Sequence, residues 1–162
     1  MTFQPERAFG GRRVLVTGGA GFVGGRLVRN LVDQGAQVTV LDDLFTGQAE
    51  VIPTSAQFVR GSVTDEGLVR ELVADASIVF HLAARNIIAS TKNPRDDFET
   101  NIGGTLNVLR ARLAAGPGGL CGIGERVWQP ALNPDQRGRS GHDALAVRRQ
   151  QDGWRALLPG VL

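Results

Sequence analysis

The sequence predicts an α/β protein in which a parallel sheet carries helices on both faces. Three observations lead to this fold class. Short apolar runs alternate with segments whose apolar residues recur at helical spacing, closely spaced glycines follow the first apolar run, and aspartates close the second. Strands that alternate with helices form strand–helix–strand units, in which the two strands run parallel.

The first such unit occupies residues 12–43. RRVLVTG at 12–18 is a short apolar run that ends in glycine, which is typical of a buried parallel strand. FVGGRLVRNLVDQG at 22–35 has apolar residues at helical spacing, and Gly35 is suited to the position after a helix end. AQVTVLDD at 36–43 is the second predicted strand.

Two further strands and two helices are predicted downstream. AQFVRGSVTD at 56–65 is a third strand, and its last residue, an aspartate, can cap a helix through Val73. SIVFHLAA at 77–84 is a fourth strand. A long helix is predicted to start at Pro94 and run to Gly116, because proline and the acids after it suit a helix N-terminus.

The chemistry of the chain is expected in the turn between the first strand and the first helix, TGGAGFVG at 17–24. Gly19, Gly21 and Gly24 satisfy G-x-G-x-x-G, while Gly18 starts the related T-G-x-x-G-x-x-G spacing. Residues without side chains let the backbone approach a pyrophosphate, and the helix that follows directs free N–H groups at this anion. The alternative is a glycine-rich turn without a ligand, but a strand before the glycines and a helix after them favour a dinucleotide site.

Asp42, at the end of the second strand, indicates which dinucleotide is bound. A carboxylate at this position can accept hydrogen bonds from both ribose hydroxyls and would repel a 2′-phosphate, which favours NAD over NADP. The next residue, Asp43, is interpreted as a solvated turn residue rather than as a second ribose ligand.

The composition excludes several classes of function. A net charge of +2 implies no general attraction to nucleic acid or to an anionic membrane. The single cysteine, Cys121, rules out an internal disulfide and a cysteine-based metal site. No apolar run approaches the roughly 18–20 residues that cross a bilayer, and the first residues lack the apolar stretch of a signal peptide. These features predict a soluble, cytoplasmic protein.

The segments VLVTGGAGFVGGRLVRNLVDQGAQVTVLDDLFTG, VFHLAA and NPRDDFETNIGGTLNVL occur in this order. Together they resemble the extended short-chain dehydrogenase/reductases, and more narrowly the NAD-dependent epimerase/dehydratases that act on nucleotide sugars. The resemblance covers residues 12–116 and implies a Rossmann-type sheet, truncated here after about four strands. It also implies NAD as cofactor, a nucleotide-sugar substrate in the parent family, and a possible homodimer.

The resemblance also implies which residues contact the cofactor. The pyrophosphate would lie against Gly18, Gly21, Phe22, Val23 and Gly24, and the adenosine ribose against Asp42. The adenine edge would lie near Ser62 and Val63, although the family usually has aspartate in place of Ser62. The nicotinamide-side ribose and phosphates would pass Leu82, Ala83, Ala84 and Arg85, with Asn101 nearby.

Other polar residues are weaker candidates for a role in catalysis. His81 lies inside the apolar run IVFHLAA, which favours a hydrogen-bonded core histidine over a catalytic one. Arg85 and Lys92 could reach a substrate phosphate, but a solvated loop is an equal alternative. His142 has no evident partner in the sequence.

The family's catalytic residues are missing from the chain. The resemblance implies a Ser or Thr and a Tyr-x-x-x-Lys pair after a fifth strand, but the sequence has no tyrosine, and its one lysine is Lys92. Residues 117–162 are rich in Gly, Pro, Arg and Gln, which form strands poorly. We therefore expect the sheet pattern to stop after Gly116, and no catalytic residue is assigned.

The genetic code offers an explanation for the tail. Read one base later, codons for GIGERVWQPALNPDQR can encode ASASVYGNPRSIPINE, which resembles the family's serine-bearing strand. Codons for ALAVRRQQDGW can encode PSPYAVSKMAG, in which the Val147 codon gives Tyr and the Gln151 codon gives Lys. The hypothesis is that residues after about 113–117 are an out-of-frame translation, and the alternative is a divergent tail along the sheet edge. Three functions stay open: part of an epimerase/dehydratase, a non-catalytic NAD-binding module, or an inert product.

Overall fold

The structure is a computed structural model that describes residues 9–116 and 119–122. These residues form a five-stranded parallel sheet of order β3-β2-β1-β4-β5. The strands are β1 (Arg13–Thr17), β2 (Gln37–Asp42), β3 (Gln57–Arg60), β4 (Ile78–His81) and β5 (Gly119–Gly122). In register, Val14 of β1 lies between Val38 of β2 and Ile78 of β4, so β1 is the central strand.

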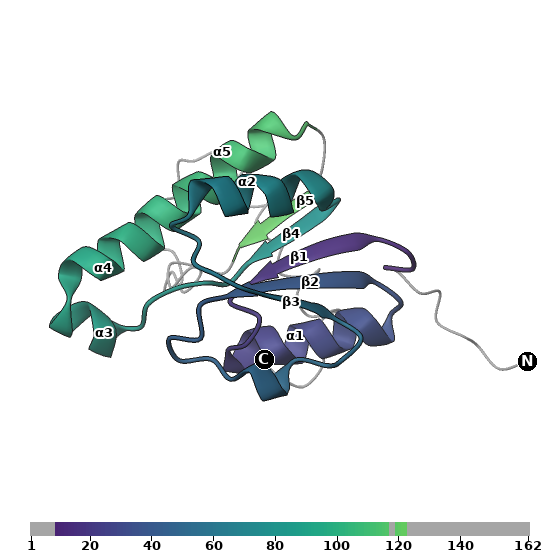
Figure 1. Ribbon diagram of the computed structural model, residues 1–162, viewed down its shortest axis with the longest axis horizontal. Coiled ribbons are helices and arrows are strands. Elements are labelled where there is room, and N and C mark those ends of the chain that lie inside the picture. Colours follow the sequence, from purple (N-terminus) through teal and green to yellow (C-terminus); the bar gives the residue numbers. More distant parts are fainter. Residues whose placement is uncertain (1–8, 117–118, 123–162) are drawn as a thin grey trace, which may run out of the picture. The chain divides into compact units, whose positions relative to one another are not determined.

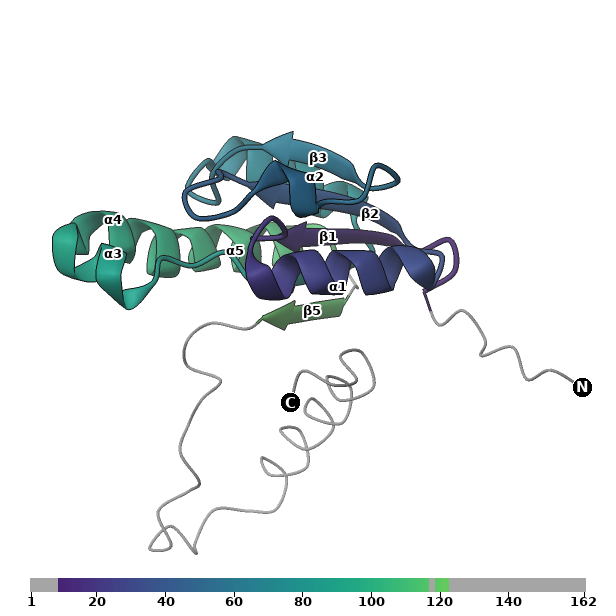
Figure 2. The same cartoon turned by 90° about the horizontal axis from the view of Figure 1, so that it is seen from below.

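Helices cover both faces of this sheet (Figures 1 and 2). The helical segments are α1 (Phe22–Asp33), the short 3-10 helix η1 (Ala49–Val51), α2 (Glu66–Asp75), α3 (Ile87–Lys92), α4 (Pro94–Phe98), the π-helix η2 (Glu99–Gly104) and α5 (Thr105–Ala114). Helix α1 packs on one face, while α2 and α5 lie side by side on the other. The predicted α/β fold with a parallel sheet and flanking helices is therefore confirmed.

Alternation along the strands divides the core between these two faces. Leu15, Leu41 and Val79 point to the α2 and α5 side, where they pack with Val69 and Val108. The neighbouring strand residues point the other way, because successive side chains of a strand face opposite sides. All five named side chains are at most 1% exposed.

The predicted helix ends are confirmed in their details. The Asp65 side chain accepts a hydrogen bond from the Leu68 N–H at 3.0 Å and caps α2. Gly35 follows α1 with a φ of +83° and donates its N–H to the Val32 carbonyl at 2.8 Å. Pro94 is the first residue of α4, and the Asn93 side chain caps that helix.

Three features differ from the sequence-based expectations. Residues 87–92, for which the sequence predicts no element, form the short helix α3. The long helix predicted from Pro94 contains the π-helical segment η2 between α4 and α5. The sheet does not stop at Gly116, because β5 pairs in parallel with β4, with Gly119 opposite Ile78. Backbone groups alone make this ladder, so a stretch of poor strand formers can still extend a sheet edge.

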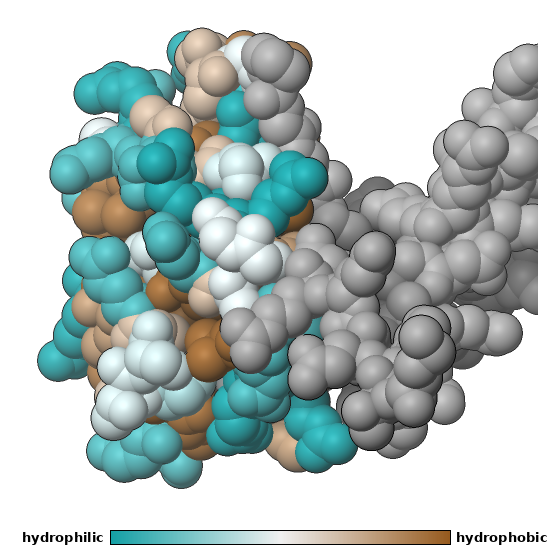
Figure 3. Space-filling view, turned by 90° about the vertical axis from the view of Figure 1, so that its right-hand side faces the viewer, coloured by the Kyte–Doolittle hydropathy of each residue, from teal (hydrophilic) through white to brown (hydrophobic). Residues whose placement is uncertain are grey.

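One end of the sheet is formed by the amino ends of its strands. The end on the right in Figure 1 presents a mixture of hydrophilic and hydrophobic residues on its described surface (Figure 3). There the exposed pair Arg13 and Asp75 joins β1 to the end of α2 at 3.5 Å.

Among the described residues, no helix is long and apolar enough to cross a membrane.

Candidate functional site

A pocket lies where the carboxyl ends of β1, β2 and β4 meet, which is where open parallel sheets bind ligands. Its walls come from the loops after these strands, with contributions from the loop after β3 and from η2. The lining residues are Gly18, Gly21, Leu41, Asp42, Asp43, Phe45, Thr46, Gly47, Gly61, Val63, Leu82, Ala83, Ala84, Arg85 and Thr100. Eight of the residues predicted to contact the cofactor are among them.

The glycine loop after β1 leaves no room for a side chain at Gly18 or Gly24. Gly18 has a φ of +71°, and a Cβ there would lie 2.6 Å from the Ala83 nitrogen. A Cβ on Gly24 would collide with the carbonyl oxygen of Gly18. The loop is therefore folded tightly against both the β4 wall and the start of α1, as the spacing of its glycines predicts.

Helix α1 begins directly after this loop, at Phe22. The N–H groups in the first turn of a helix have no partner within the helix, and the helix dipole makes this end attractive to an anion. The Phe22 side chain is 93% exposed, and neither Phe22 nor Val23 lines the pocket. The arrangement can hold a pyrophosphate.

Asp42, at the end of β2, is buried and oriented by backbone groups. Its Oδ2 accepts a hydrogen bond from the Ala20 N–H at 2.9 Å, and its Oδ1 accepts one from the Leu44 N–H at 2.8 Å. The first bond fixes the carboxylate to the glycine loop, and the second fixes it to the loop after β2. Each carboxylate oxygen can accept more than one hydrogen bond, so Asp42 can still bind ligand hydroxyls.

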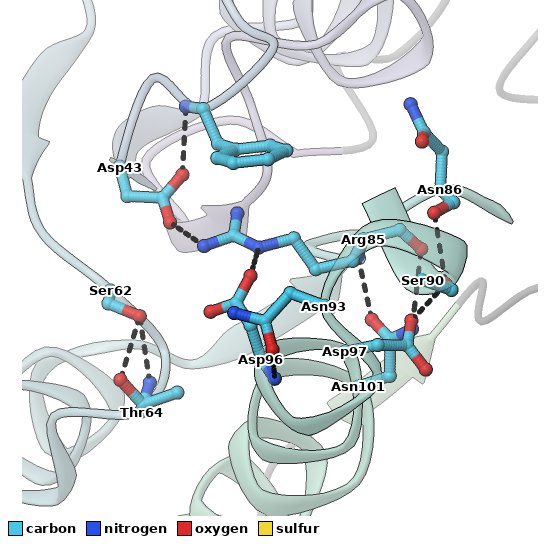
Figure 4. A network of polar contacts seen from close by, with 11 residues as sticks. Asp43, Ser62, Thr64, Arg85, Asn86, Ser90, Asn93, Asp96, Asp97 and Asn101 are labelled. Atoms are coloured by element: carbon cyan, nitrogen blue, oxygen red, sulfur yellow. Dashed lines mark hydrogen bonds and ion pairs between the residues drawn. The ribbon is translucent and has the colours of Figure 1, made fainter. Parts of the chain in front are cut away.

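Arg85 bridges the pocket from the β4 side to two carboxylates (Figure 4). It donates to Asp43 Oδ2 and to Asp96 Oδ2, both at 2.8 Å, and its guanidinium lies 4.0 Å from the centre of the Phe45 ring. Burial opposes the charge of Arg85, but the hydrogen bonds to the two carboxylates outweigh it and raise the pKa of Arg85. Asp43 is thus not the solvated turn residue predicted from the sequence, because the guanidinium is held against it.

His81, the last residue of β4, is confirmed as a hydrogen-bonded core residue. Its Nδ1 lies 2.7 Å from the Thr17 hydroxyl, and its Nε2 lies 3.0 Å from the Thr105 hydroxyl. Burial lowers the pKa of His81 to about 4, so the ring is neutral near pH 7. It does not line the pocket.

The remaining predicted residues have structural contacts of their own. Asn101 accepts a hydrogen bond from the Arg85 N–H at 2.7 Å and thereby supports the β4 wall from η2 (Figure 4). The Ser62 hydroxyl lies 2.9 Å from that of Thr64, within the turn before α2. Lys92 is exposed on α3 and does not line the pocket. His142 lies outside the described residues, as do all residues after Gly122 in the two segments that were read in a shifted frame.

Thr100 is a lining residue that the sequence did not indicate. It lies on η2, it is 3% exposed, and within the described part of the chain its hydroxyl has no hydrogen-bond partner. A buried hydroxyl without a partner is costly unless a ligand or water satisfies it. A threonine in a predicted helix carries no signal of this kind, so only the fold reveals it.

The residues at this pocket fit a dinucleotide. The glycine loop packs so closely that a Cβ on Gly18 or Gly24 would collide with backbone atoms, and the helix end after it can receive a pyrophosphate. The buried Thr100 hydroxyl has no hydrogen-bond partner among the described residues. Fold and site together define a Rossmann-type dinucleotide-binding protein.

Comparison with known proteins shows which family of dinucleotide-binding proteins the chain belongs to. The chain belongs to the NAD-dependent epimerase/dehydratase family, whose model matches residues 14–124. This match continues past Gly116 and includes β5.

Similar proteins carry the names of several sugar-nucleotide enzymes. A UDP-glucose 4-epimerase of Lactobacillus helveticus is 38% identical over 61% of this chain and 31% of its own length. A UDP-N-acetyl-alpha-D-glucosaminuronate decarboxylase of Bacillus cytotoxicus is 37% identical over 63% of this chain and 33% of its own. The solved UDP-glucose 4-epimerase of Thermus thermophilus in complex with NAD superimposes with a TM-score of 0.62 and 40% identity, over 67% of this chain and 36% of that one. The chain thus spans about a third of the length of these relatives.

Proposed function

We propose that this chain binds NAD as the nucleotide-binding part of an epimerase/dehydratase that acts on a nucleotide sugar. The observation that carries the proposal is the glycine loop folded onto Asp42, with Ala20 N–H to Asp42 Oδ2 at 2.9 Å. This pair places a carboxylate beside a helix N-terminus, and these are the two partners that a ribose and a pyrophosphate need. A cytoplasmic location stays a prediction from the sequence.

The proposed contacts follow the pocket. The pyrophosphate would be bound by backbone groups of the loop, and the adenosine ribose by Asp42. The adenine would lie near Val63 and the backbone of Ser62, because the Ser62 hydroxyl already bonds within its own turn. Leu82, Ala83, Ala84 and Arg85 would face the nicotinamide half, with Asn101 behind them. The Thr100 hydroxyl is a further candidate contact.

NAD would supply a hydride acceptor for a sugar hydroxyl in the parent reaction. Hydride transfer also needs a base near the nicotinamide, and the chain has neither a tyrosine nor a lysine beyond Lys92. His81 cannot replace this base, because both of its ring nitrogens are engaged by threonine hydroxyls. We propose that the chain as written does not turn over a nucleotide sugar.

Two origins of this incomplete site are proposed. In the first, the residues after about 113–117 are an out-of-frame translation of a complete enzyme, which the two family-like segments in the shifted reading support. In the second, the chain is a non-catalytic NAD-binding module, which the absence of tyrosine would suit. The nucleotide sequence across codons 108–165 decides between them. Restoring the shifted frame should yield a longer chain that is active on a nucleotide sugar, and an early stop codon in that frame would refute the first origin.

A homodimer is proposed on a separate observation. Five large apolar side chains follow one another at helical spacing along α4, η2 and α5, and each is 42–82% exposed. They are Phe98, Ile102, Leu106, Leu109 and Leu113. Such a stripe is typical of a helix that packs on another helix. Sedimentation should show a dimer, and Leu109→Glu should shift the protein to a monomer without loss of helical content.

Titration of the chain with NAD and NADP tests the cofactor proposal. NAD should bind more tightly, because the Asp42 carboxylate would lie against a 2′-phosphate. Asp42→Ala should weaken NAD binding by roughly 10- to 100-fold, the value of one or two charged hydrogen bonds, and should reduce the discrimination. Asp75→Ala, which removes an exposed carboxylate at the other end of the sheet, is the matched control and should change neither. Equal or tighter binding of NADP by the unmodified chain would refute the role of Asp42.

A further inference from the structure

We propose that His81 is a positioning residue, which holds the β4 wall of the nucleotide pocket, residues 82–85, as a neutral imidazole with its proton on Nε2. The wall itself lines the pocket, whereas His81 lies behind it between β1 and α5. The functional part of this inference rests on the proposed NAD site. The protonation state does not, and it can be tested separately.

The hydrogen bonds of Thr105 fix the proton on one side of the ring. The Thr105 hydroxyl lies 2.6 Å from the backbone carbonyl oxygen of Asn101, which can only accept. The single hydroxyl proton is therefore used in that bond. Toward His81 Nε2, at 3.0 Å, the Thr105 oxygen must accept, so Nε2 carries a hydrogen.

The other side of the ring follows from this assignment. A neutral imidazole with a hydrogen on Nε2 has a bare Nδ1, which accepts the proton of the Thr17 hydroxyl at 2.7 Å. The Thr17 oxygen is then free to accept, and the N–H groups of Leu82 and Ala83 both donate to it at 3.2 Å. The direction of every bond from Asn101 to Ala83 is thus determined.

This chain of bonds supports the wall at both of its ends. Thr17 holds the first residues, Leu82 and Ala83, and Asn101 holds the last one through its bond to the Arg85 N–H. His81 joins the two supports, because it connects Thr17 to Thr105 and Thr105 bonds to the Asn101 backbone. The position of Ala83 matters for the pocket, since its nitrogen would lie 2.6 Å from a Cβ at Gly18.

Protonation of the His81 ring would reverse one hydrogen bond of this network, the one between the Thr17 hydroxyl and Nδ1. A hydrogen on Nδ1 would face the Thr17 hydroxyl, which would have to turn its own proton away from the ring. Thr17 would then have to accept from three donors at once, so its bonds to Leu82 and Ala83 would weaken. The neutral state is therefore part of the support that His81 provides, and burial of the ring maintains it.

The protonation state is tested by NMR on the full 162-residue chain. His142→Gln leaves His81 as the only histidine, so the imidazole nitrogens can be assigned without ambiguity. The nitrogen spectrum should show a neutral ring with its hydrogen on Nε2 at about pH 7.5 and at about pH 5.5. A hydrogen on Nδ1, or titration at the ordinary value near 6.5, would overturn the assignment whether or not the chain binds NAD.

The positioning role is tested through Thr105, which donates no bond to the wall. Thr105→Val should raise the amide hydrogen-exchange rate of Ala83 about tenfold, because its effect travels through His81 and Thr17. Leu82 should respond less, because its N–H also donates to the Thr17 backbone carbonyl at 3.0 Å. Thr105→Ser keeps the hydroxyl and should leave these rates within about twofold. Unchanged exchange in the valine variant would overturn the role.

NAD affinity gives a second measurement of the same role. Thr17→Val should weaken NAD binding about tenfold and Thr17→Ser should restore it, because only the serine keeps a hydroxyl for His81 and the wall. Equal affinities of the two variants and the unmodified chain would refute the role. If the unmodified chain binds no NAD, the proposed function fails. Hydrogen exchange then still tests whether His81 positions the wall at residues 82–85.

Discussion

The loop after β1 and the wall after β4 lie against each other at the pocket, yet they are held in different ways. The glycine loop at 17–24 owes its shape to missing side chains, as the backbone contacts of Gly18 and Gly24 show. The wall at 82–85 owes its place to side chains from distant segments, since Thr17 and Asn101 hold it 65 and 16 residues away in sequence. The glycine loop is thus determined by residues that are close together in the sequence. The wall at 82–85 is determined by polar contacts between residues that are far apart in the sequence.

This difference has a consequence for how each wall can be damaged. A loop whose glycines touch the backbone is broken by adding atoms to them, because there is no space for those atoms. A wall supported by hydrogen bonds is broken by removing a partner or by changing its protonation, because a buried polar group then loses its bond. The following predictions test the two modes.

The largest effect is expected from adding one methyl group to the loop. Gly18→Ala combines a positive φ with a Cβ 2.6 Å from the Ala83 nitrogen, and should lower the free energy of unfolding by about 4 kcal/mol. Gly11→Ala is the matched control, because Gly11 has a φ of +70° but nothing within 4 Å of an added Cβ. It should cost only about 1–2 kcal/mol. Urea unfolding measures both, and equal losses would show that the contact with Ala83 does not shape the loop.

A smaller effect is expected from changing the pH around His81. The native pKa of about 4 lies below the value of 6.5 expected after unfolding, so the unfolded chain binds the extra proton between these values. This contribution to the free energy of unfolding is complete above pH 6.5 and is lost as the pH falls through 4, and it amounts to roughly 3 kcal/mol.

Urea unfolding at about pH 7.5, 5.5 and 4.5 measures this loss. His81→Asn has no imidazole to titrate, so its free energy of unfolding should fall less steeply over this range. His142→Gln should retain the full dependence. Parallel curves for His81→Asn and the unmodified chain would contradict the assignment of the pH dependence to His81.

The smallest effect is expected from removing the arginine of the wall. Arg85→Met keeps much of the apolar stem but leaves Asp43 and Asp96 without their partner, and should cost about 1–2 kcal/mol. The control is Arg95→Met, since Arg95 pairs with Glu99 at the surface with 87% of its side chain exposed. It should cost less than about 0.5 kcal/mol. Thermal unfolding distinguishes the two, and a larger loss for Arg95→Met would contradict this ranking of the ion pairs.

The same contrast explains how much could be predicted from the sequence. The glycine loop, the cap of Asp65 and the position of Gly35 were predicted correctly, because their signals lie within a few residues of the structure they produce. The ion pair of Asp43 with Arg85 was not predicted, because it joins residues 42 positions apart. Nothing near Thr100 in the sequence shows that this residue lines a pocket.

Two local features were missed for a different reason. The π-helical segment η2 depends on a shift of backbone hydrogen bonds, and the apolar spacing of a helix does not report such a shift. Strand β5 depends on the open edge of β4, which accepts a neighbour through backbone groups whatever the side chains are. Strand propensity alone therefore predicted a sheet with too few strands.

Because β1 is the central strand of the sheet, its two edges are paired at different times while the chain is being synthesised. Its partner on one side, β2, follows soon, but the residues of β4 that pair with it lie 64 positions later, as Thr17 and His81 do. At a synthesis rate of about 5–20 residues per second, one edge of β1 waits roughly 3–13 s for its neighbour. During this time an apolar strand of the emerging chain has an unpaired edge that could join another chain. Strand β1, which leads into the glycine loop of the pocket, is thus also open to pairing with another chain while the protein is being made.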